Sequence, residues 1–130
     1  MSLTHSSKVV FAGLLFGLSV ALTGVQAKAP LPTDQQQTVS VAELPLQGRQ
    51  IYQRIHQGGP FVAEKDGVVF ANRERLLPSR QRGFYREYTV PTPGVRHRGV
   101  RRIVCGGEQT RPEVCYYTAD HYESFRRIAP

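Results

Sequence analysis

The sequence predicts an α+β domain in which one helix packs on an antiparallel β-sheet. Three observations lead to this prediction. After the first 27 residues, only residues 46–57 place apolar side chains at spacings that share one helix face. Residues 68–128 instead contain short runs that are rich in β-branched and aromatic residues. Asp-Gly, Pro-Gly and Gly-Gly pairs separate these runs, as is typical of strands joined by turns.

The N-terminal segment, residues 1–27, is typical of a secretory signal peptide. Residues 1–8 are weakly basic, and residues 9–25 are apolar and rich in Leu, Val, Ala and Gly. Val25 and Ala27 then place small residues at the two positions that a signal peptidase reads, so we expect cleavage after Ala27. An uncleaved membrane anchor is the alternative, although the apolar run is short for a span of about 20 residues.

The segment that follows, residues 28–42, is predicted to be a flexible leader because it is rich in Pro, Gln and Thr and has no apolar period. The folded domain is then expected to cover residues 43–130. It should begin with the helix over residues 46–57, which a Gly-Gly-Pro sequence stops. A chain of this size can bury one compact core.

The strands follow the helix. They are predicted at residues 68–70, 85–90, 101–105, 115–118 and 124–128. Side chains alternate between the two faces of a strand, so Tyr85, Glu87 and Thr89 should share one face and Tyr88 should lie on the other. The helix should cover one face of the sheet and leave the opposite face free to carry a site.

Glu87 is the acidic residue of the best-defined strand, residues 85–90. A carboxylate does not face a core cheaply unless it is paired, so we expect Glu87 on the open face, beside Arg102 of the neighbouring strand. Arg98 would point the same way as Arg102 if one strand runs through both. The sequence therefore predicts a carboxylate next to paired guanidiniums.

The charge balance is basic. Lys and Arg number 17 against 10 Asp and Glu, which gives a formal net charge of +7. Arginines cluster between residues 73 and 102, a distribution that favours a polyanionic partner. On charge alone, a soluble domain that merely happens to be basic is the alternative.

The two cysteines, Cys105 and Cys115, flank a segment that is predicted to be the turn of a hairpin. An exported protein meets an oxidising compartment, which allows a disulfide. The register of the hairpin is not fixed by the sequence, so a bridge and two free thiols both remain open. No pair of Cys or His residues has zinc-ligand spacing, and we expect neither a metal nor a cofactor.

Glu87, Arg98, Arg102 and His121 supply the groups that metal-free cleavage of an RNA backbone requires. A carboxylate can take the proton of the ribose 2′-hydroxyl, and an imidazole can protonate the departing 5′-oxygen. Guanidiniums can hold the phosphate as its charge builds. Singly, each residue also has an ordinary explanation: His121 could be a surface histidine, and Glu87 could pair with an arginine across strands.

Four segments carry a resemblance to a known family. They are residues 66–74 (DGVVFANRE), 85–90 (YREYTV), 98–103 (RGVRRI) and 116–125 (YYTADHYESF). In this order they resemble the guanine-binding loop, the catalytic strands and the closing segment of the bacterial guanyl-specific ribonucleases, the barnase group. The similarity runs from about residue 44 to residue 128, is closest to the short secreted members, and implies the microbial ribonuclease fold.

The resemblance also implies roles for the residues that match. Glu87 would be the general base and His121 the general acid. Arg98 and Arg102 would stabilise the pentavalent phosphate. The first step would give a 2′,3′-cyclic phosphate, which water would then open to a 3′-phosphate.

Base recognition follows from the same resemblance. One carboxylate can accept from both N1–H and N2–H₂ of guanine, and Glu74 would be that carboxylate. Backbone N–H groups around Asn72 and Arg73 would donate to O6. Phe70 and Tyr122 would provide walls for stacking. A purely structural turn over this loop is the alternative.

Two features depart from the family pattern. Ala71 stands where close relatives carry a larger polar residue, and the cysteines that join the two termini of those relatives are missing here. A local disulfide between Cys105 and Cys115 could replace the disulfide that joins the termini of those relatives.

Together these observations predict a secreted endoribonuclease, extracellular or periplasmic, that cleaves single-stranded RNA on the 3′ side of guanosine without a metal. The 2′-hydroxyl requires RNA, and a free Watson–Crick edge requires a single strand. We expect a monomer without stable membrane association once the signal is removed, and an acidic inhibitor of the barstar kind as a protein partner. The alternative is a basic secreted nucleic-acid-binding or antibacterial toxin protein without turnover.

Overall fold

The computed structural model describes residues 37–130 and three isolated glycines nearer the N-terminus. The predicted signal peptide and most of the predicted leader therefore lie outside the described residues. Within the part that is described, none of the helices has the length and apolar character needed to cross a membrane.

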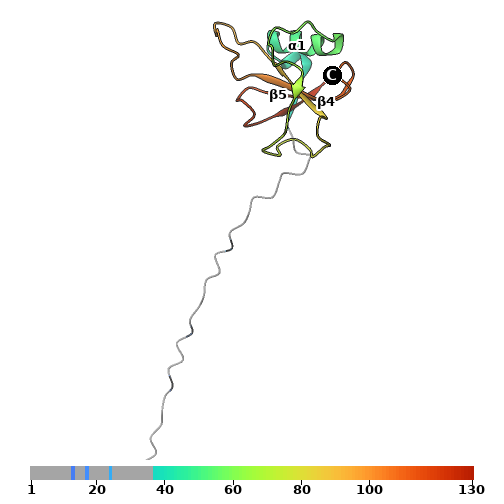
Figure 1. The fold of residues 1–130 in the computed structure, drawn as a ribbon. Coiled ribbons are helices and arrows are strands. Elements are labelled where there is room, and N and C mark those ends of the chain that lie inside the picture. The colour runs from blue at the N-terminus through green and yellow to red at the C-terminus, as the bar shows by residue number, and fades with distance from the viewer. Residues whose placement is uncertain (1–12, 14–16, 18–23, 25–36) are drawn as a thin grey trace, which may run out of the picture.

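One six-stranded sheet and one α-helix make up the fold, which confirms the predicted α+β class (Figure 1). The sheet order is β1-β6-β5-β4-β3-β2. Its strands are β1 (Thr38–Ser40), β2 (Val68–Val69), β3 (Tyr85–Thr89), β4 (Arg102–Gly107), β5 (Pro112–Thr118) and β6 (Arg126–Ala129). Neighbouring strands are antiparallel except for β1 and β6, which are parallel.

The described fold begins earlier than the predicted domain boundary at residue 43. Strand β1 and the short 3₁₀ helix η2 (Val41–Glu43) fall largely within the predicted leader. Val39 pairs with Ile128 of β6 and is buried, and the N–H and hydroxyl of Ser40 both donate to the Glu43 carboxylate at 2.8 Å. Because a three-residue edge strand with a single buried side chain has no apolar period, the sequence pattern does not reveal it.

Helix α1 (Leu46–Gln57) has the bounds predicted from its apolar spacing. Ile51 and Ile55 are buried on the side that faces the sheet. The helix ends at Gly58, whose φ of 82° lies in the left-handed region and lets its N–H donate to carbonyls of the last turn.

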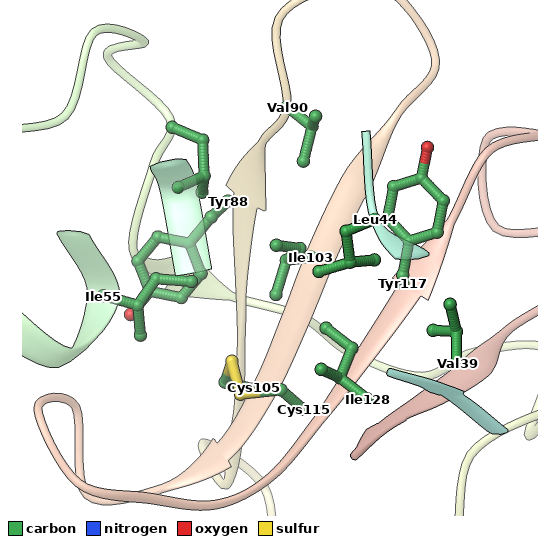
Figure 2. Close-up of a cluster of buried hydrophobic side chains, with 11 residues drawn as sticks. Val39, Leu44, Ile55, Tyr88, Val90, Ile103, Cys105, Cys115, Tyr117 and Ile128 are labelled. Atoms are coloured by element: carbon green, nitrogen blue, oxygen red, sulfur yellow. A yellow bond between two sulfur atoms is a disulfide. The ribbon is translucent and has the colours of Figure 1, made fainter. Parts of the chain in front are cut away.

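The main core lies between α1 and the sheet (Figure 2). Tyr88 of β3 belongs to this core, on the face opposite Glu87, as the predicted alternation requires. The buried members of the core are Val39, Leu44, Ile51, Ile55, Tyr88, Val90, Ile103, Cys105, Cys115, Tyr117 and Ile128.

The opposite face of the sheet is not fully open, contrary to the prediction. A second cluster, here called the aromatic cluster, covers part of it, and two connections outside the sheet supply several of its members. It comprises Leu77, Tyr85, Val104, Tyr116 and Phe125, with Phe70, Phe84, Val114 and Tyr122 packed against them. The predicted site is therefore built at the edge of a second apolar layer.

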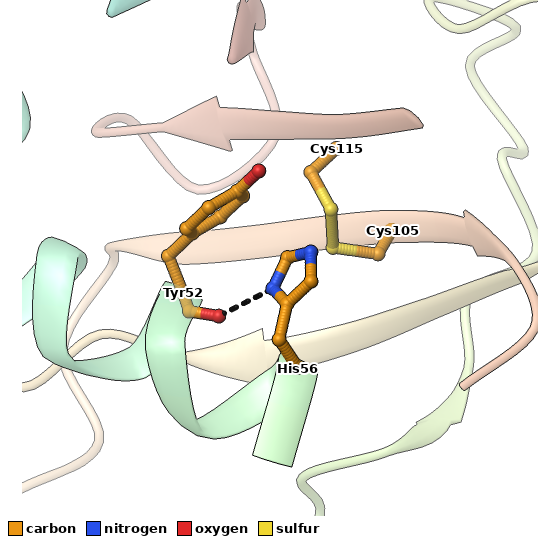
Figure 3. The surroundings of a disulfide bond; sticks show 4 residues. All are labelled: Tyr52, His56, Cys105 and Cys115. Carbon is orange, nitrogen blue, oxygen red and sulfur yellow. Dashed lines mark hydrogen bonds between the residues drawn. A yellow bond between two sulfur atoms is a disulfide. The ribbon is translucent and has the colours of Figure 1, made fainter. Parts of the chain in front are cut away.

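Cys105 of β4 and Cys115 of β5 face each other in register, with their Cα atoms 4.1 Å apart, and form a disulfide (Figure 3). Tyr52 and His56 of α1 lie beside the bridge (Figure 3). The sequence left this bridge open, and the β4–β5 register now places the two cysteines directly opposite each other.

Removal of the disulfide by the double substitution Cys105→Ala/Cys115→Ala is expected to lower the free energy of unfolding by about 2–4 kcal/mol. The bridge joins residues that are 10 apart in the chain, so it restricts the unfolded state. Urea denaturation with and without reductant measures the effect. Reductant should destabilise the wild type and leave the double variant unchanged; an equal response of both proteins would refute this role of the bridge.

Candidate active site

A cavity of about 330 Å³ opens beside the aromatic cluster. It is lined by residues 69–74 together with Leu76, Glu87, Tyr122 and Phe125. We call it the first cavity. It gathers Glu87 and all the residues predicted to bind the base, which come from three separate parts of the chain.

The loop that forms one side of the first cavity is closed by Asn72. This residue has a φ of 51°, in the left-handed region that Asn tolerates better than most residues. Its Nδ2 donates to the Leu77 carbonyl at 2.9 Å, and its Oδ1 accepts from the Leu77 N–H at 3.2 Å. The Asn72 side chain is thus used within the loop, while Arg73 and Glu74 are exposed and line the cavity.

Glu87 is held by two donors from different segments. Its Oε1 accepts from Arg98 Nη2 and its Oε2 accepts from the Tyr122 hydroxyl, both at 2.8 Å. The Glu87 side chain is 13% exposed, so the carboxylate is oriented but still accessible to a ligand.

The predicted pairing of Glu87 with Arg102 is wrong, because Arg98 is the partner at 2.8 Å. Strand β4 begins at Arg102, so Arg98 lies in the preceding connection and not on the strand. The register sets Arg102 opposite Thr89 and Val104 opposite Glu87. Arg98 reaches Glu87 from the connection instead.

Arg98 is itself positioned by β3 and by a buried carboxylate. Its Nε donates to Thr89 Oγ1 at 2.6 Å, and its Nη2 lies 3.9 Å from Asp66 Oδ1. The Asp66 side chain is only 1% exposed and also accepts from the Thr89 N–H at 2.6 Å. The sequence pattern missed Asp66, because an Asp-Gly pair between two elements predicts only a turn.

Arg102 is a buried cation with a free donor. The residue is 2% exposed, and among residues 37–130 no carboxylate oxygen lies within 4.0 Å of its guanidinium. Its Nη1 donates to the Arg101 carbonyl at 2.8 Å, while its buried Nε makes no hydrogen bond within these residues. Its guanidinium carbon lies 6.0 Å from the centre of the Tyr122 ring, at the side of the site. A buried, incompletely satisfied guanidinium suits an anionic ligand.

His121 is presented by a strained turn after β5. His121 and Tyr122 have φ values of 55° and 72°, which are uncommon for residues other than glycine. The turn is fixed because the His121 N–H donates to the Val100 carbonyl and the Tyr122 N–H donates to Thr118 Oγ1, both at 3.1 Å. The imidazole is exposed, 4.8 Å from the Tyr122 ring between centroids.

Tyr122 should make stability sensitive to alkaline pH. Burial, together with its hydrogen bond to Glu87, raises the pKa of Tyr122 from 10.0 to about 12. The folded state therefore keeps a proton that the unfolded state loses, so this stabilisation is present below pH 10 and is lost as the pH rises toward 12. Urea denaturation across this range should show a smaller loss of stability in Tyr122→Phe than in the wild type. Equal losses in the two proteins would contradict this origin.

The family model described as ribonuclease matches residues 27–129. The chain belongs to the bacterial guanyl-specific ribonuclease family. Guanyl-specific ribonuclease Sa3 of Kitasatospora aureofaciens is 52% identical over 90 residues, which are 69% of this chain and 62% of Sa3. Ribonuclease Sa of the same organism is 48% identical over 91 residues, 70% of this chain and 92% of Sa.

The solved structures of this ribonuclease family agree with the fold. Ribonuclease Sa2, in a structure with mononucleotides, has a TM-score of 0.68 and 41% identity, and covers 73% of this chain and 95% of its own. A structure of Sa2 with guanosine-2′-cyclophosphate gives a TM-score of 0.66 at the same identity, over 73% of this chain and 97% of its own. Membership in the family and the microbial ribonuclease fold are thereby confirmed.

Proposed function

We propose that this protein is a secreted, metal-independent endoribonuclease that cleaves single-stranded RNA on the 3′ side of guanosine. The observation that carries the proposal is the link between the first cavity and the Glu87 network, since one continuous site combines a place for a base with an oriented carboxylate. The names of Sa and Sa3 as guanyl-specific ribonucleases support the guanosine preference. Sa2 structures with guanosine-2′-cyclophosphate and with 3′-GMP support a route through a cyclic phosphate.

Glu87 is the general base in this proposal. With guanine in the first cavity, the ribose 2′-hydroxyl lies beside the carboxylate and gives up its proton as the oxygen attacks phosphorus. Arg98 and Tyr122 each bind one carboxylate oxygen at 2.8 Å, which fixes the direction from which the proton is accepted.

Arg98 and Arg102 bind the phosphate, and His121 completes the transfer. The Arg102 guanidinium, whose carbon lies 6.0 Å from the centre of the Tyr122 ring, stabilises the charge that builds on the pentavalent phosphate. The exposed imidazole of His121 protonates the departing 5′-oxygen, which leaves a 2′,3′-cyclic phosphate. In the second step the two proton-transfer groups exchange roles, and water opens the ring to a 3′-phosphate.

The base is recognised at the loop of residues 70–74. Glu74 accepts from N1–H and N2–H₂ of guanine, a pair of donors that adenine does not offer. Backbone N–H groups around Asn72 and Arg73 donate to O6. The ring centroids of Phe70 and Tyr122 are 5.0 Å apart, which leaves no room for a base between them. They therefore form one aromatic wall on which guanine stacks.

Glu74→Gln is expected to reduce the preference for guanosine over adenosine by about 10- to 100-fold, because hydrogen bonds to a charged group contribute about 1.5–3 kcal/mol. The measurement is kcat/KM for the dinucleotides GpU and ApU. Glu123→Gln, an exposed residue with no proposed role, is the matched control. A ratio unchanged by Glu74→Gln would remove this residue from guanine recognition.

The function is tested on the protein purified after export. Sequencing its N-terminus also tests whether the signal peptide is cleaved after Ala27. In excess chelator the protein should cut single-stranded RNA and leave DNA of the same sequence intact. The new 3′ ends of the RNA fragments should all lie at guanosine. Folded protein that binds RNA without cutting it would establish the alternative, a binding protein without turnover.

We further propose secretion, a monomeric state and an acidic inhibitor of the barstar kind. A disulfide fits an oxidising compartment, and the excess of Lys and Arg over Asp and Glu suits an acidic protein that covers the site. Such an inhibitor should compete with RNA and bind more weakly as salt is added.

A further inference from the structure

The turn after β5 contains a carboxylate that the proposed mechanism does not use. Asp120 directly precedes His121, the proposed acid. Its Oδ1 accepts from the Thr118 hydroxyl at 2.8 Å and from the Ser124 N–H at 2.9 Å, and its Oδ2 accepts from the Ser124 hydroxyl at 2.5 Å. These three residues, here called the Asp120 network, tie the end of β5 to the far side of the turn.

The hydrogen bonds of the network hold the Asp120 carboxylate in its charged form. Burial favours the neutral form, but the hydrogen bonds from Ser124 and Thr118 outweigh it and hold the pKa of Asp120 below its usual range. Hydrogen bonds to a charged acceptor are shorter and stronger than those between neutral groups. At neutral pH the network is therefore stronger than the hydrogen bonds of an ordinary turn.

The direction of the His121 imidazole depends on this turn. The imidazole is exposed, and the ring that it contacts, that of Tyr122, belongs to the same turn. Both residues have left-handed φ values, a conformation that persists only when surrounding contacts stabilise it. Asp120 and Ser124 lie on either side of the two strained residues, so their hydrogen bonds help to fix the direction in which the imidazole projects.

Tyr122 is held by contacts that do not include the Asp120 carboxylate. Its N–H donates to Thr118 Oγ1 at 3.1 Å, and its hydroxyl donates to Glu87 at 2.8 Å. Its ring packs against the aromatic cluster. Loss of the Asp120 carboxylate should therefore release His121, while Tyr122 and Glu87 keep their places.

We propose that Asp120 is a positioning residue, whose carboxylate aims the His121 imidazole at the departing 5′-oxygen through the hydrogen bonds that it accepts from Thr118 and Ser124. This inference rests on the proposed function, because it assumes that His121 is the acid. It gives Asp120 a part in the departure of the leaving group, and none in the binding of guanine or in the attack of the 2′-hydroxyl.

Asp120→Ala separates positioning of the acid from a purely structural role. On GpU, kcat should fall about 10- to 100-fold, because a small misplacement of a catalytic group can cost that much. The KM for GpU should stay within about twofold of the wild-type value, since the first cavity is unchanged. On guanosine 3′-nitrophenyl phosphate, whose leaving group needs no protonation, kcat should stay within about threefold of the wild-type value.

Asp120→Asn tests whether the hydrogen bonds or the charge of Asp120 position the acid. The amide oxygen can still accept from the Ser124 N–H, and the amide nitrogen can donate to the Ser124 hydroxyl, so most of the network remains. On GpU, kcat should recover to within about fivefold of the wild-type value. A loss as large as that of Asp120→Ala would contradict positioning by hydrogen bonds.

Ser124→Ala keeps the test valid if Asp120→Ala does not fold. It removes one hydrogen bond of the network at an exposed residue and leaves the backbone N–H in place. On GpU, kcat should fall about two- to tenfold, and on the nitrophenyl substrate it should not change.

The matched control is Glu123→Ala, which removes another carboxylate from the same turn at an exposed position. It should match the wild type on both substrates. Thermal unfolding of each variant establishes that it folds.

Two results would overturn the inference while the proposed function stands. In one, folded Asp120→Ala and Ser124→Ala lose the same factor on both substrates, which would indicate a structural role alone. In the other, neither variant loses activity on GpU. A wild-type protein that cleaves neither substrate, or a loss in His121→Gln that is equal on both, would instead overturn the proposed function, and the inference with it.

Discussion

Glu87→Gln is expected to lower kcat/KM for cleavage after guanosine by about 10²- to 10⁴-fold. Glutamine keeps the size of the side chain, and its amide oxygen can still accept from Arg98 or Tyr122, but it cannot take the proton of the 2′-hydroxyl at neutral pH. Steady-state kinetics with GpU give the loss.

The control for Glu87→Gln must separate chemistry from folding. The substitution removes the carboxylate that pairs with Arg98, so the variant needs a thermal unfolding curve beside its kinetics. Glu123→Gln, which has the same change in chemistry at an exposed position, should retain full activity. A folded Glu87→Gln protein within tenfold of the wild type would show that Glu87 is not the base.

His121→Gln is expected to cause a loss of similar size, about 10²- to 10⁴-fold on GpU. The imidazole is exposed, and the turn that presents it is held by backbone N–H groups that donate to the Val100 carbonyl and to Thr118 Oγ1, so the substitution should leave the fold intact. Unlike the loss in Glu87→Gln, this loss should depend on the leaving group.

A substrate with an acidic leaving group tests that difference. Guanosine 3′-nitrophenyl phosphate expels a phenolate that needs no protonation, so a general acid contributes little. On this substrate His121→Gln should approach the wild-type rate, whereas Glu87→Gln should remain impaired because the 2′-hydroxyl must still be deprotonated. If both variants are impaired equally on both substrates, the assignment of base and acid is wrong.

The elements whose apolar side chains recur at regular helical or strand spacing could be predicted from the sequence. Helix α1 has the predicted bounds because its apolar residues recur at helical spacing and a glycine stops it. The alternation along β3 placed Glu87 and Tyr88 on opposite faces for the same reason. The disulfide required the β4–β5 register, which depends on tertiary pairing and so stayed open until the structure placed the two cysteines opposite each other.

The parts that depend on contacts between distant segments could not be predicted. The partner of Glu87 is Arg98, because β4 begins too late to include that arginine. The buried Asp66 lies behind Arg98 although its sequence setting predicts only a turn. Strand β1 has three residues and is positioned by β6, more than 80 residues later in the chain, as the pairing of Thr38 with Arg127 requires. Side-chain reach and strand pairing, which have no local period, determine these features.

The most direct measurement of the central proposal uses one oligonucleotide with a single guanosine and a second that differs only by 2′-deoxyguanosine at that position. In excess chelator, the protein should cut the first on the 3′ side of guanosine, through a 2′,3′-cyclic phosphate, and should leave the second intact. Moving the deoxy substitution to any other position should not prevent cleavage at guanosine. Equal cutting of both oligonucleotides would contradict attack by the 2′-hydroxyl, and with it the roles proposed for Glu87 and His121.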